Sequence, residues 1–352
     1  MPEPLTIRER IHATVAGLSA ADAVTWTSWW HRMSQLPPRR EVRLGEAWEH
    51  NRAELTTSLP TPYLQSSSPS LIDPAGPTDD AEWFVVAVRH HLGQRLDGTQ
   101  ANQPYEVWHE LAARRSADPD SVRGRVGTAI GLANLSDGAT PPTSGHDNPH
   151  HFDDMACVRA VAAGLVRPGD PTGAAELAEV DAAVTHSLDG VWGARAYAAL
   201  ISSLVGGAGI PAATSAALHE LPADSWCAHV AAEFLGAATE PGSVMELAAR
   251  LEREVVDHVY AYSTQAPETL GLLLAHLSAA ADGTELLLGA LCHPRHGDSL
   301  APLAGAVAGA AYGLPTAPLP TLGGVCVRDL AGVSLESIVD TLCDGVTLES
   351  TR

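Results

Sequence analysis

The sequence Gly-Pro-Thr-Asp-Asp at residues 76–80 marks the point where a Pro- and Ser-rich segment ends and a regular helical pattern begins. Thr78 stands at an N-cap position, and Asp79 and Asp80 fall in the first turn of the predicted helix. Carboxylates at this end are stabilised by the helix dipole, so the pattern is typical of an ordinary capped helix. Two adjacent carboxylates also repel each other, and a bound divalent cation relieves that repulsion. The stretch therefore has two interpretations, a helix cap and half of a metal site.

A second acidic helix start lies far downstream, where His296 is followed by Asp298 and Ser299. If the helices beginning at Asp79 and Ser299 face each other, their oxygen ligands come from two distant segments and form one site for a hard cation. We expect the clustered carboxylates to have no lysine or arginine beside them, so that a cation is needed as counter-charge. The two stretches together predict bound Mg²⁺ or Mn²⁺, as one or two ions.

Charge and composition exclude several classes of function. The 352 residues include 21 basic and 42 acidic side chains, which gives a net charge of −21. A field of this sign argues against binding to DNA or RNA. No run of about 18 apolar residues occurs, so no membrane span is expected. The five cysteines are scattered without CxxC spacing, which indicates free thiols in a reducing compartment and predicts a cytoplasmic protein.

Apolar residues recur at helical spacing along most of the chain, and no segment alternates as a half-buried strand does. The first predicted helix covers Ile7–Met33, and further helices begin at Asp79, Gln103, Ser121, Gly173 and Leu300. Residues 34–77 are the least regular part and form either a lid or a solvated connection. We predict one all-α domain over residues 1–352, built as a compact bundle of many helices.

Polar side chains crowd the segment 146–154, which leads into the apolar helix that carries Arg159. Asn148 and His151 stand close to the adjacent acids Asp153 and Asp154. Such a segment is either an exposed loop or part of a site. Two other candidate substrate contacts, His186 and Trp29, also have two interpretations each. His186 follows the helix at 173–184 and is a packed core histidine or a ligand contact, and Trp29 is a core residue or a platform for a flat ring.

In this order the motifs resemble those of the ADP-ribosylglycohydrolase family, the group that includes dinitrogenase-reductase-activating glycohydrolase and the J1 crystallins. Residues 17–24 resemble the opening Gly–Asp helix of the family, with Ala21 where glycine is usual. The stretch 76–80 is similar to its Thr-Asp-Asp metal motif. Thr185 and His186 resemble its mid-chain Thr-His segment, and residues 298–310 resemble its C-terminal metal motif and helix.

The resemblance implies an all-α bundle with a dinuclear Mg²⁺ centre that hydrolyses an N- or O-glycosidic bond at C1″ of ADP-ribose. It implies that His186 and the 146–152 loop face the substrate, with Arg159 as one of the arginines that could meet a pyrophosphate. The positions that match the metal ligands of the family are Thr78, Asp79, Asp80, Asp298 and Ser299.

Two departures from the family pattern affect the expected chemistry. His296 stands where the family usually has an aspartate; as a metal ligand it favours Mn, Fe or Zn over Mg²⁺. The acid expected about two turns after Asp22 is missing, because residues 25–31 contain none. Asp80, Asp153 and Asp154 are then the candidate catalytic groups, with Glu41 or Glu46 as alternatives if the lid folds back.

The sequence thus predicts a metal-dependent hydrolase of a ribosyl bond, with an ADP-ribose-like or nucleoside-type small molecule as its substrate. Two alternatives remain. One is the same fold used for another small-molecule transformation in a biosynthetic pathway. The other is an ADP-ribose binder that has lost catalysis.

Overall fold

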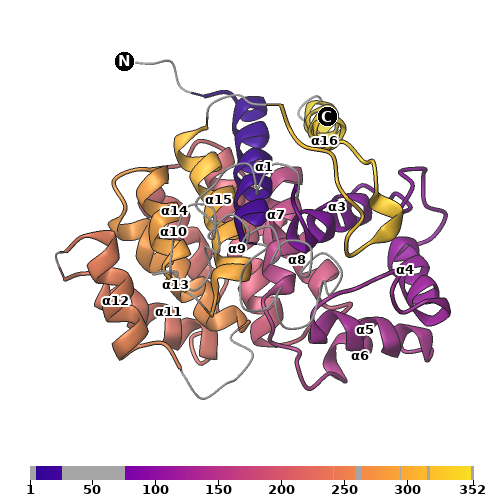
Figure 1. Cartoon of the computed structure of the whole chain (residues 1–352), viewed down its shortest axis with the longest axis horizontal. Coiled ribbons are helices and arrows are strands. Elements are labelled where there is room, and N and C mark those ends of the chain that lie inside the picture. Colours follow the sequence, from indigo (N-terminus) through magenta and orange to yellow (C-terminus); the bar gives the residue numbers. More distant parts are fainter. Residues whose placement is uncertain are drawn as a thin grey trace, which may run out of the picture.

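The computed structural model describes residues 5–25, 76–240, 242–257, 264–293, 295–314 and 318–349 (Figure 1). Within these ranges the chain is helical and has no strand, only isolated β-bridges, so the predicted all-α class is confirmed. The helices are α1 (Ile7–Val24), α3 (Asp79–His91), α4 (Glu106–Ala117), α5 (Val126–Ser136), α6 (Thr143–His146), α7 (Met155–Val166), α8 (Pro171–Ala182), α9 (Asp189–Val205), α10 (Ile210–His219), α11 (Trp226–Ala237), α12 (Val244–Glu254), α13 (Ala266–Ala279), α14 (Gly283–Leu291), α15 (Gly297–Tyr312) and α16 (Leu335–Glu349), with the short 3₁₀ helix η4 (Arg328–Leu330).

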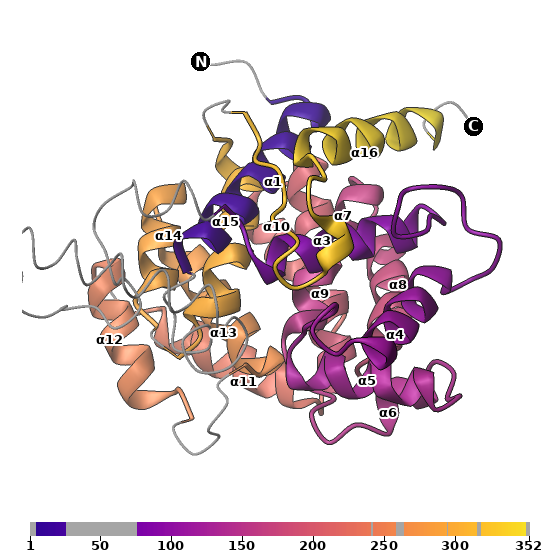
Figure 2. The ribbon, with the colours of Figure 1, turned by 45° about the vertical axis from the view of Figure 1, so that its right-hand side comes forward.

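Helices α1 and α15 pack against each other in antiparallel fashion through glycines (Figures 1 and 2). A Cβ on Gly17 would lie 2.0 Å from the carbonyl oxygen of Gly305, and a Cβ on Gly309 would lie 2.0 Å from that of Ala13. Only glycine allows two backbones to approach so closely. Because the helices run in opposite directions, the end of α1, which carries Asp22, lies at the start of α15, which carries Asp298.

Helix α7 forms the middle of the molecule, where it packs against α3, α8 and α9. Every residue from Met155 to Leu165 is buried, and the side chains are mostly small and apolar. The orange and salmon helices α11–α14 gather on one side of this centre, and α4–α6 lie on the other (Figure 2). The starts of α3, α7 and α15 are all buried, so the acids that open these helices point into the protein rather than into water.

The predicted helix boundaries need correction in several places. Helix α1 ends at Val24, short of the predicted Met33, and residues 26–75 lie outside the described part. The composition of residues 136–152, rich in Gly, Pro, Thr and His, predicts a loop, but the segment contains the short helix α6. The sequence pattern predicts a last helix over Val325–Leu342, but α16 begins at Leu335. Glu82 of α3 accepts hydrogen bonds at 2.7 Å from the backbone N–H groups of residues 325–327 and holds them in an irregular conformation.

None of the described helices is long and apolar enough to cross a membrane. All five cysteines lie within the described ranges as free thiols, and Cys292 alone among them is only partly buried. Burial raises the pKa of Cys157 and Cys326 well above the usual value for a thiol, which suits packing residues rather than reactive ones.

Candidate active site

The start of α3 is held by an acid from another helix. Thr78 occupies the N-cap position, but its side chain makes no capping hydrogen bond to α3. Asp22 of α1 instead accepts from the backbone N–H groups of Thr78 at 2.7 Å and Ala81 at 3.0 Å, and the Thr78 hydroxyl also donates to it. A carboxylate is the stronger acceptor for these N–H groups. Asp22 is therefore the cap of α3, and Thr78 and Asp79 lie beside it, joined by a 3.2 Å hydrogen bond.

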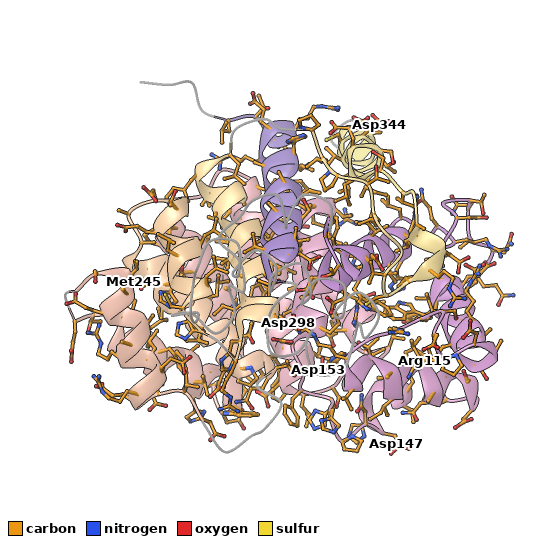
Figure 3. All side chains as sticks on the ribbon, in the orientation of Figure 1. Arg115, Asp147, Asp153, Met245, Asp298 and Asp344 are labelled. Atoms are coloured by element: carbon orange, nitrogen blue, oxygen red, sulfur yellow. The ribbon has the colours of Figure 1, made fainter. Side chains whose placement is uncertain are left out.

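Three acidic helix starts meet at one arginine. Arg125, the N-cap residue of α5, donates through Nη2 to Asp80 at 3.1 Å and to Asp298 at 3.2 Å. Its Nη1 donates to Asp154 and to the hydroxyl of Ser299. All five side chains are buried. Figure 3 labels Asp298 and Asp153, the neighbour of Asp154, near the middle of the molecule. We call Asp80, Arg125, Asp154, Asp298 and Ser299 the acidic centre.

Pairing between distant segments positions these side chains. Val122 bridges to Val327, and the backbone of Arg123 donates to Cys326 at 2.7 Å, which fixes the approach to Arg125. The backbone of Asp154 donates to Thr264 at 2.8 Å, and the hydroxyl of Thr269 donates to the Asp154 carboxylate at 2.7 Å. The geometry of the acidic centre is therefore set by the backbone as well as by attraction between charges.

The acidic centre contains more acid than base. Burial raises the pKa of Asp80 well above its usual value; Arg125 lowers it, while Asp79, Asp22 and Asp298 raise it further. Burial also raises the pKa of Asp154. Burial would lower the pKa of Arg125, but Asp154, Asp80 and Asp298 outweigh burial and raise it. Oδ2 of Asp80 is buried without a hydrogen-bond partner among the described residues. Asp80 is therefore the group of this cluster best suited to keep a proton.

The described side chains do not fit a Mg²⁺ centre in this arrangement. Mg²⁺ requires a near-octahedral set of oxygen ligands, whereas oxygens of Asp80, Asp154, Asp298 and Ser299 are hydrogen-bonded to Arg125. His296 points its Nε2 at Glu268, 2.8 Å away. No group of three or more His, Cys, Asp or Glu in the described ranges has an arrangement suited to a metal ion. The expectation that no arginine lies beside the carboxylates was wrong, and metal binding stays a prediction.

Asp153 and His186 form a second buried arrangement beside the acidic centre. Asp153 accepts from His186 Nε2 at 2.7 Å and from the backbone N–H groups of Gly127 and Met155 at 2.8 and 3.0 Å. His186 Nδ1 lies 2.7 Å from the hydroxyl of Thr185. Burial alone would raise the pKa of Asp153, but His186, Arg125 and the N–H donors lower it. Because its oxygens are already engaged, Asp153 is better suited to orient His186 than to act as a base.

Arg159 and Asn148, two predicted substrate contacts, are buried and bind protein groups. Arg159 donates to Asp181 at 2.6 Å and to Thr185 at 2.9 Å. Asn148 donates to the backbone carbonyls of Gly127 and Thr185 at 2.9 and 2.8 Å. Both side chains join helices that flank the site. Their predicted substrate contact is untested.

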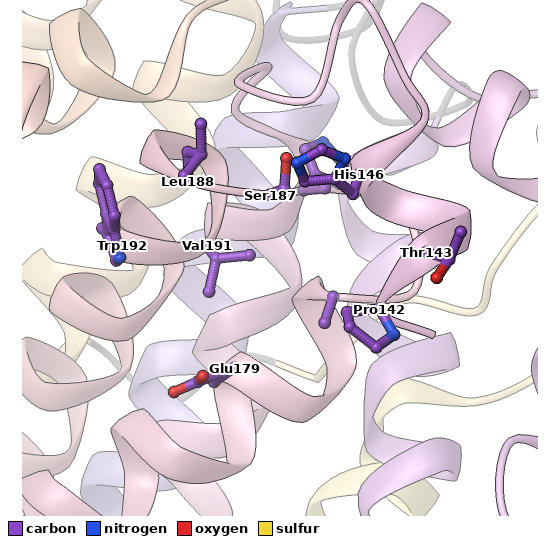
Figure 4. A pocket seen from close by; sticks show the side chains of 10 residues that line it. Pro142, Thr143, His146, Glu179, Ser187, Leu188, Val191 and Trp192 are labelled. Atoms are coloured by element: carbon purple, nitrogen blue, oxygen red, sulfur yellow. The ribbon is translucent and has the colours of Figure 1, made fainter. Parts of the chain in front are cut away.

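Of the two further predicted substrate contacts, only His151 falls within the described residues. His151 is partly buried, with Nδ1 3.1 Å from the carbonyl oxygen of Ser187. Trp29 lies outside the described residues. A pocket of about 340 Å³ opens next to His186. It is lined on one side by Pro142, Thr143 and His146 and on the other by Leu188 and Trp192 (Figure 4).

Sequence reasoning did not identify Arg125, Glu268 or Thr269 as members of this region. Arg125 stands at the start of an apolar, glycine-containing helix, where an unpaired charge is unusual, and that is the one signal that pointed to it. Glu268 and Thr269 lie in an ordinary first helical turn. Nothing in the sequence links Glu268 to His296, 28 residues away, or Thr269 to Asp154, 115 residues away.

The fold and site define a class of helical proteins in which buried acids from separate helix starts meet at one centre. The ADP-ribosylglycohydrolase family profile matches residues 3–348, and the chain belongs to that family. A solved structure described as an "ADP-ribosylglycohydrolase-related protein complex" is similar in fold, with a TM-score of 0.60 and 17% identity over 96% of this chain and 97% of that one. No curated protein matches the chain.

Proposed function

We propose that this protein cleaves or transfers at a ribosyl-type anomeric carbon of an ADP-ribose-like or nucleoside-type small molecule, with the acidic centre as the reaction site. The observation that carries the proposal is the meeting of Asp80, Asp154 and Asp298, from three helix starts, in one buried cluster. Membership in the ADP-ribosylglycohydrolase family supports the substrate class.

Cleavage of a glycosidic bond passes through a state with positive charge on the sugar ring, and it requires a proton for the leaving group. Buried carboxylates stabilise that charge because they need no rearrangement during the reaction. Asp80, whose pKa burial raises, is the group suited to donate the proton. Arg125 fixes the positions of the three acids, and Asp153 acts through His186 rather than on the bond itself.

The pocket beside His186 supports a ligand with a flat or apolar part. Trp192 and Leu188 contribute apolar surface to it. Leu188 is 48% exposed and has a φ of 48°, in the left-handed region that a bulky side chain rarely adopts. Backbone strain of this kind concentrates at ligand-binding sites. His186 lines this pocket and is hydrogen-bonded to Asp153. Asp153 is the sequence neighbour of Asp154, a member of the acidic centre.

A substrate panel tests the proposal directly. ADP-ribosylated histone, ADP-ribose, NAD and simple nucleosides are each incubated with the wild type and with Asp80→Asn, and the products are separated by chromatography. We expect turnover of a small molecule that Asp80→Asn reduces by about 10²–10⁴-fold, the usual contribution of a general acid. The exposed Asp340→Asn variant serves as the control and keeps wild-type turnover. Equal turnover by Asp80→Asn and wild type would refute this role for Asp80.

One observation favours a second function, binding of ADP-ribose without catalysis. Arg125 occupies oxygens of Asp154, Asp298 and Ser299, and these are then less available to activate water. Calorimetry with ADP-ribose separates the two functions. Tight binding without turnover of any member of the panel indicates a binder, and turnover of any member indicates the enzyme.

A further inference from the structure

We propose that the guanidinium of Arg125 is the built-in cation of the acidic centre and takes the place that a divalent metal ion would otherwise occupy. The proposal concerns what neutralises the cluster and does not depend on which ligand the protein binds.

The contacts of Arg125 match those of a bound cation. Its two terminal nitrogens reach four side chains that come from the starts of α3, α7 and α15. These four side chains supply only oxygen atoms, which are the ligands that a hard divalent cation prefers. A planar guanidinium presents several N–H donors in a fixed fork, so it can bind oxygens from several directions at once. Arg125 is therefore at the point where these oxygens converge.

The protein holds Arg125 in place independently of these contacts. As the N-cap residue of α5, it is fixed by the backbone pairing of residues 121–123 with 326–328. Its side chain is 1% exposed. The backbone of Arg125 is therefore held by this pairing on its N-terminal side and by helix α5 on its C-terminal side.

A second observation concerns the other nitrogen ligand expected near this point. His296 is the N-cap residue of α15, two residues before Asp298. Its Nε2 is paired with Glu268 of α13, which also accepts a hydrogen bond from the backbone of Asp257. The imidazole of His296, a possible metal ligand, is thus paired with the carboxylate of Glu268, outside the acidic centre.

Repulsion between positive charges opposes binding of a divalent metal ion beside the guanidinium of Arg125. A divalent ion bound to the same oxygens would lie next to the guanidinium, and the two positive charges would repel each other strongly in a buried site. Three carboxylates around one guanidinium still leave an excess of negative charge. Removing the guanidinium without replacing its charge therefore creates the conditions under which a divalent ion binds.

Manganese titration followed by electron paramagnetic resonance tests this inference with the full chain. We expect the wild type to have no Mn²⁺ site that Asp298→Asn weakens. We expect Arg125→Ala to gain one Mn²⁺ site at least about tenfold tighter than any site in the wild type, which corresponds to about 1.4 kcal/mol. Thermal unfolding gives a second measurement, because Mn²⁺ should raise the melting temperature of Arg125→Ala alone.

Arg159→Ala is the matched control, because it removes another fully buried arginine that pairs with a single carboxylate. We expect this variant to gain no Mn²⁺ site. Arg125→Gln, which keeps more of the side-chain volume, replaces Arg125→Ala if the alanine variant does not fold. A folded Arg125 variant that binds Mn²⁺ no better than wild type would overturn the inference, as would a tight wild-type site abolished by Asp298→Asn. If neither Arg125 variant folds, the comparison of Mn²⁺ binding by the wild type and by Asp298→Asn decides whether the inference holds.

Discussion

Two fully buried arginines, Arg125 and Arg159, differ in the charge around them. Arg159 pairs with one carboxylate, that of Asp181, donates to one hydroxyl and stacks over Trp108 with 4.9 Å from its guanidinium carbon to the ring centroid. Arg125 contacts three carboxylates and one hydroxyl and has no ring beside it among the described contacts. The first group is close to charge balance, whereas the second has an excess of acid.

This difference separates a structural cluster from a candidate functional one. A balanced buried pair joins helices and gains nothing from a further ligand. An unbalanced cluster is unfavourable by itself, and proteins keep such clusters where function requires them. The comparison therefore assigns Arg159 to the packing of α7 against α8 and assigns Arg125 to the candidate active site.

The largest expected effect is the loss of protein stability when the balanced pair of Arg159 and Asp181 is broken. Arg159→Met leaves Asp181 buried without its main counter-charge and should lower the free energy of unfolding by about 3–5 kcal/mol. Urea denaturation measures this loss. The double variant Arg159→Met/Asp181→Leu removes both charges and should recover most of the stability. A double variant as unstable as the single one would show that packing, and not charge, sets the cost.

Neutralising one acid should affect the two clusters differently. Asp181→Asn weakens the pair with Arg159 and should cost about 1.5–3 kcal/mol, the contribution of a hydrogen bond to a charged group. Asp80→Asn keeps the acceptor for Arg125 and places its amide nitrogen at the position of the unpartnered Oδ2. It also removes repulsion, so its stability should stay within about 1 kcal/mol of the wild type. If urea denaturation shows equal losses of stability for Asp181→Asn and Asp80→Asn, the proposed difference in charge balance between the two clusters is wrong.

The smallest of these effects is a dependence on acid pH. Burial would raise the pKa of Asp181, but Arg159 and His90 outweigh it and hold this pKa well below its usual value. An acid whose pKa is lowered by folding stabilises the protein above its unfolded pKa of about 3.9 and loses this contribution as the pH falls further. Thermal unfolding from pH 6 to about pH 3 should therefore show a steeper loss for wild type than for Asp181→Asn. Parallel curves would show that Asp181 is not the group responsible.

Much of the fold could be predicted from the sequence, because helical spacing and glycine placement are local signals. The apolar pattern indicates an all-α chain, and the small residues of α1 and α15 are typical of closely packed helices. The irregular segment near Val325 could not be predicted, because it depends on contact with a distant helix. Glu82, for example, holds residues 325–327 from more than two hundred residues away.

The candidate site was predicted only in part. The sequence indicates Asp80, Asp154 and Asp298, because acids at helix starts form a recognisable pattern, and it indicates Ser299 as the neighbour of Asp298. The structure brings these four residues together. Arg125 was missed because its one signal, a charge at the start of an apolar helix, is weak in a sequence with 21 basic residues. Its role depends on which side chains surround it, and that information appears only when four distant segments are folded together.

The most direct test of the central claim is a crystal structure of the wild-type protein grown with Mn²⁺, recorded near the manganese absorption edge. The charge argument predicts electron density for the guanidinium of Arg125 among the side chains of Asp80, Asp154 and Asp298, with no anomalous peak in contact with their oxygens. An anomalous peak bound by these carboxylates, with Arg125 turned away from them, would contradict it.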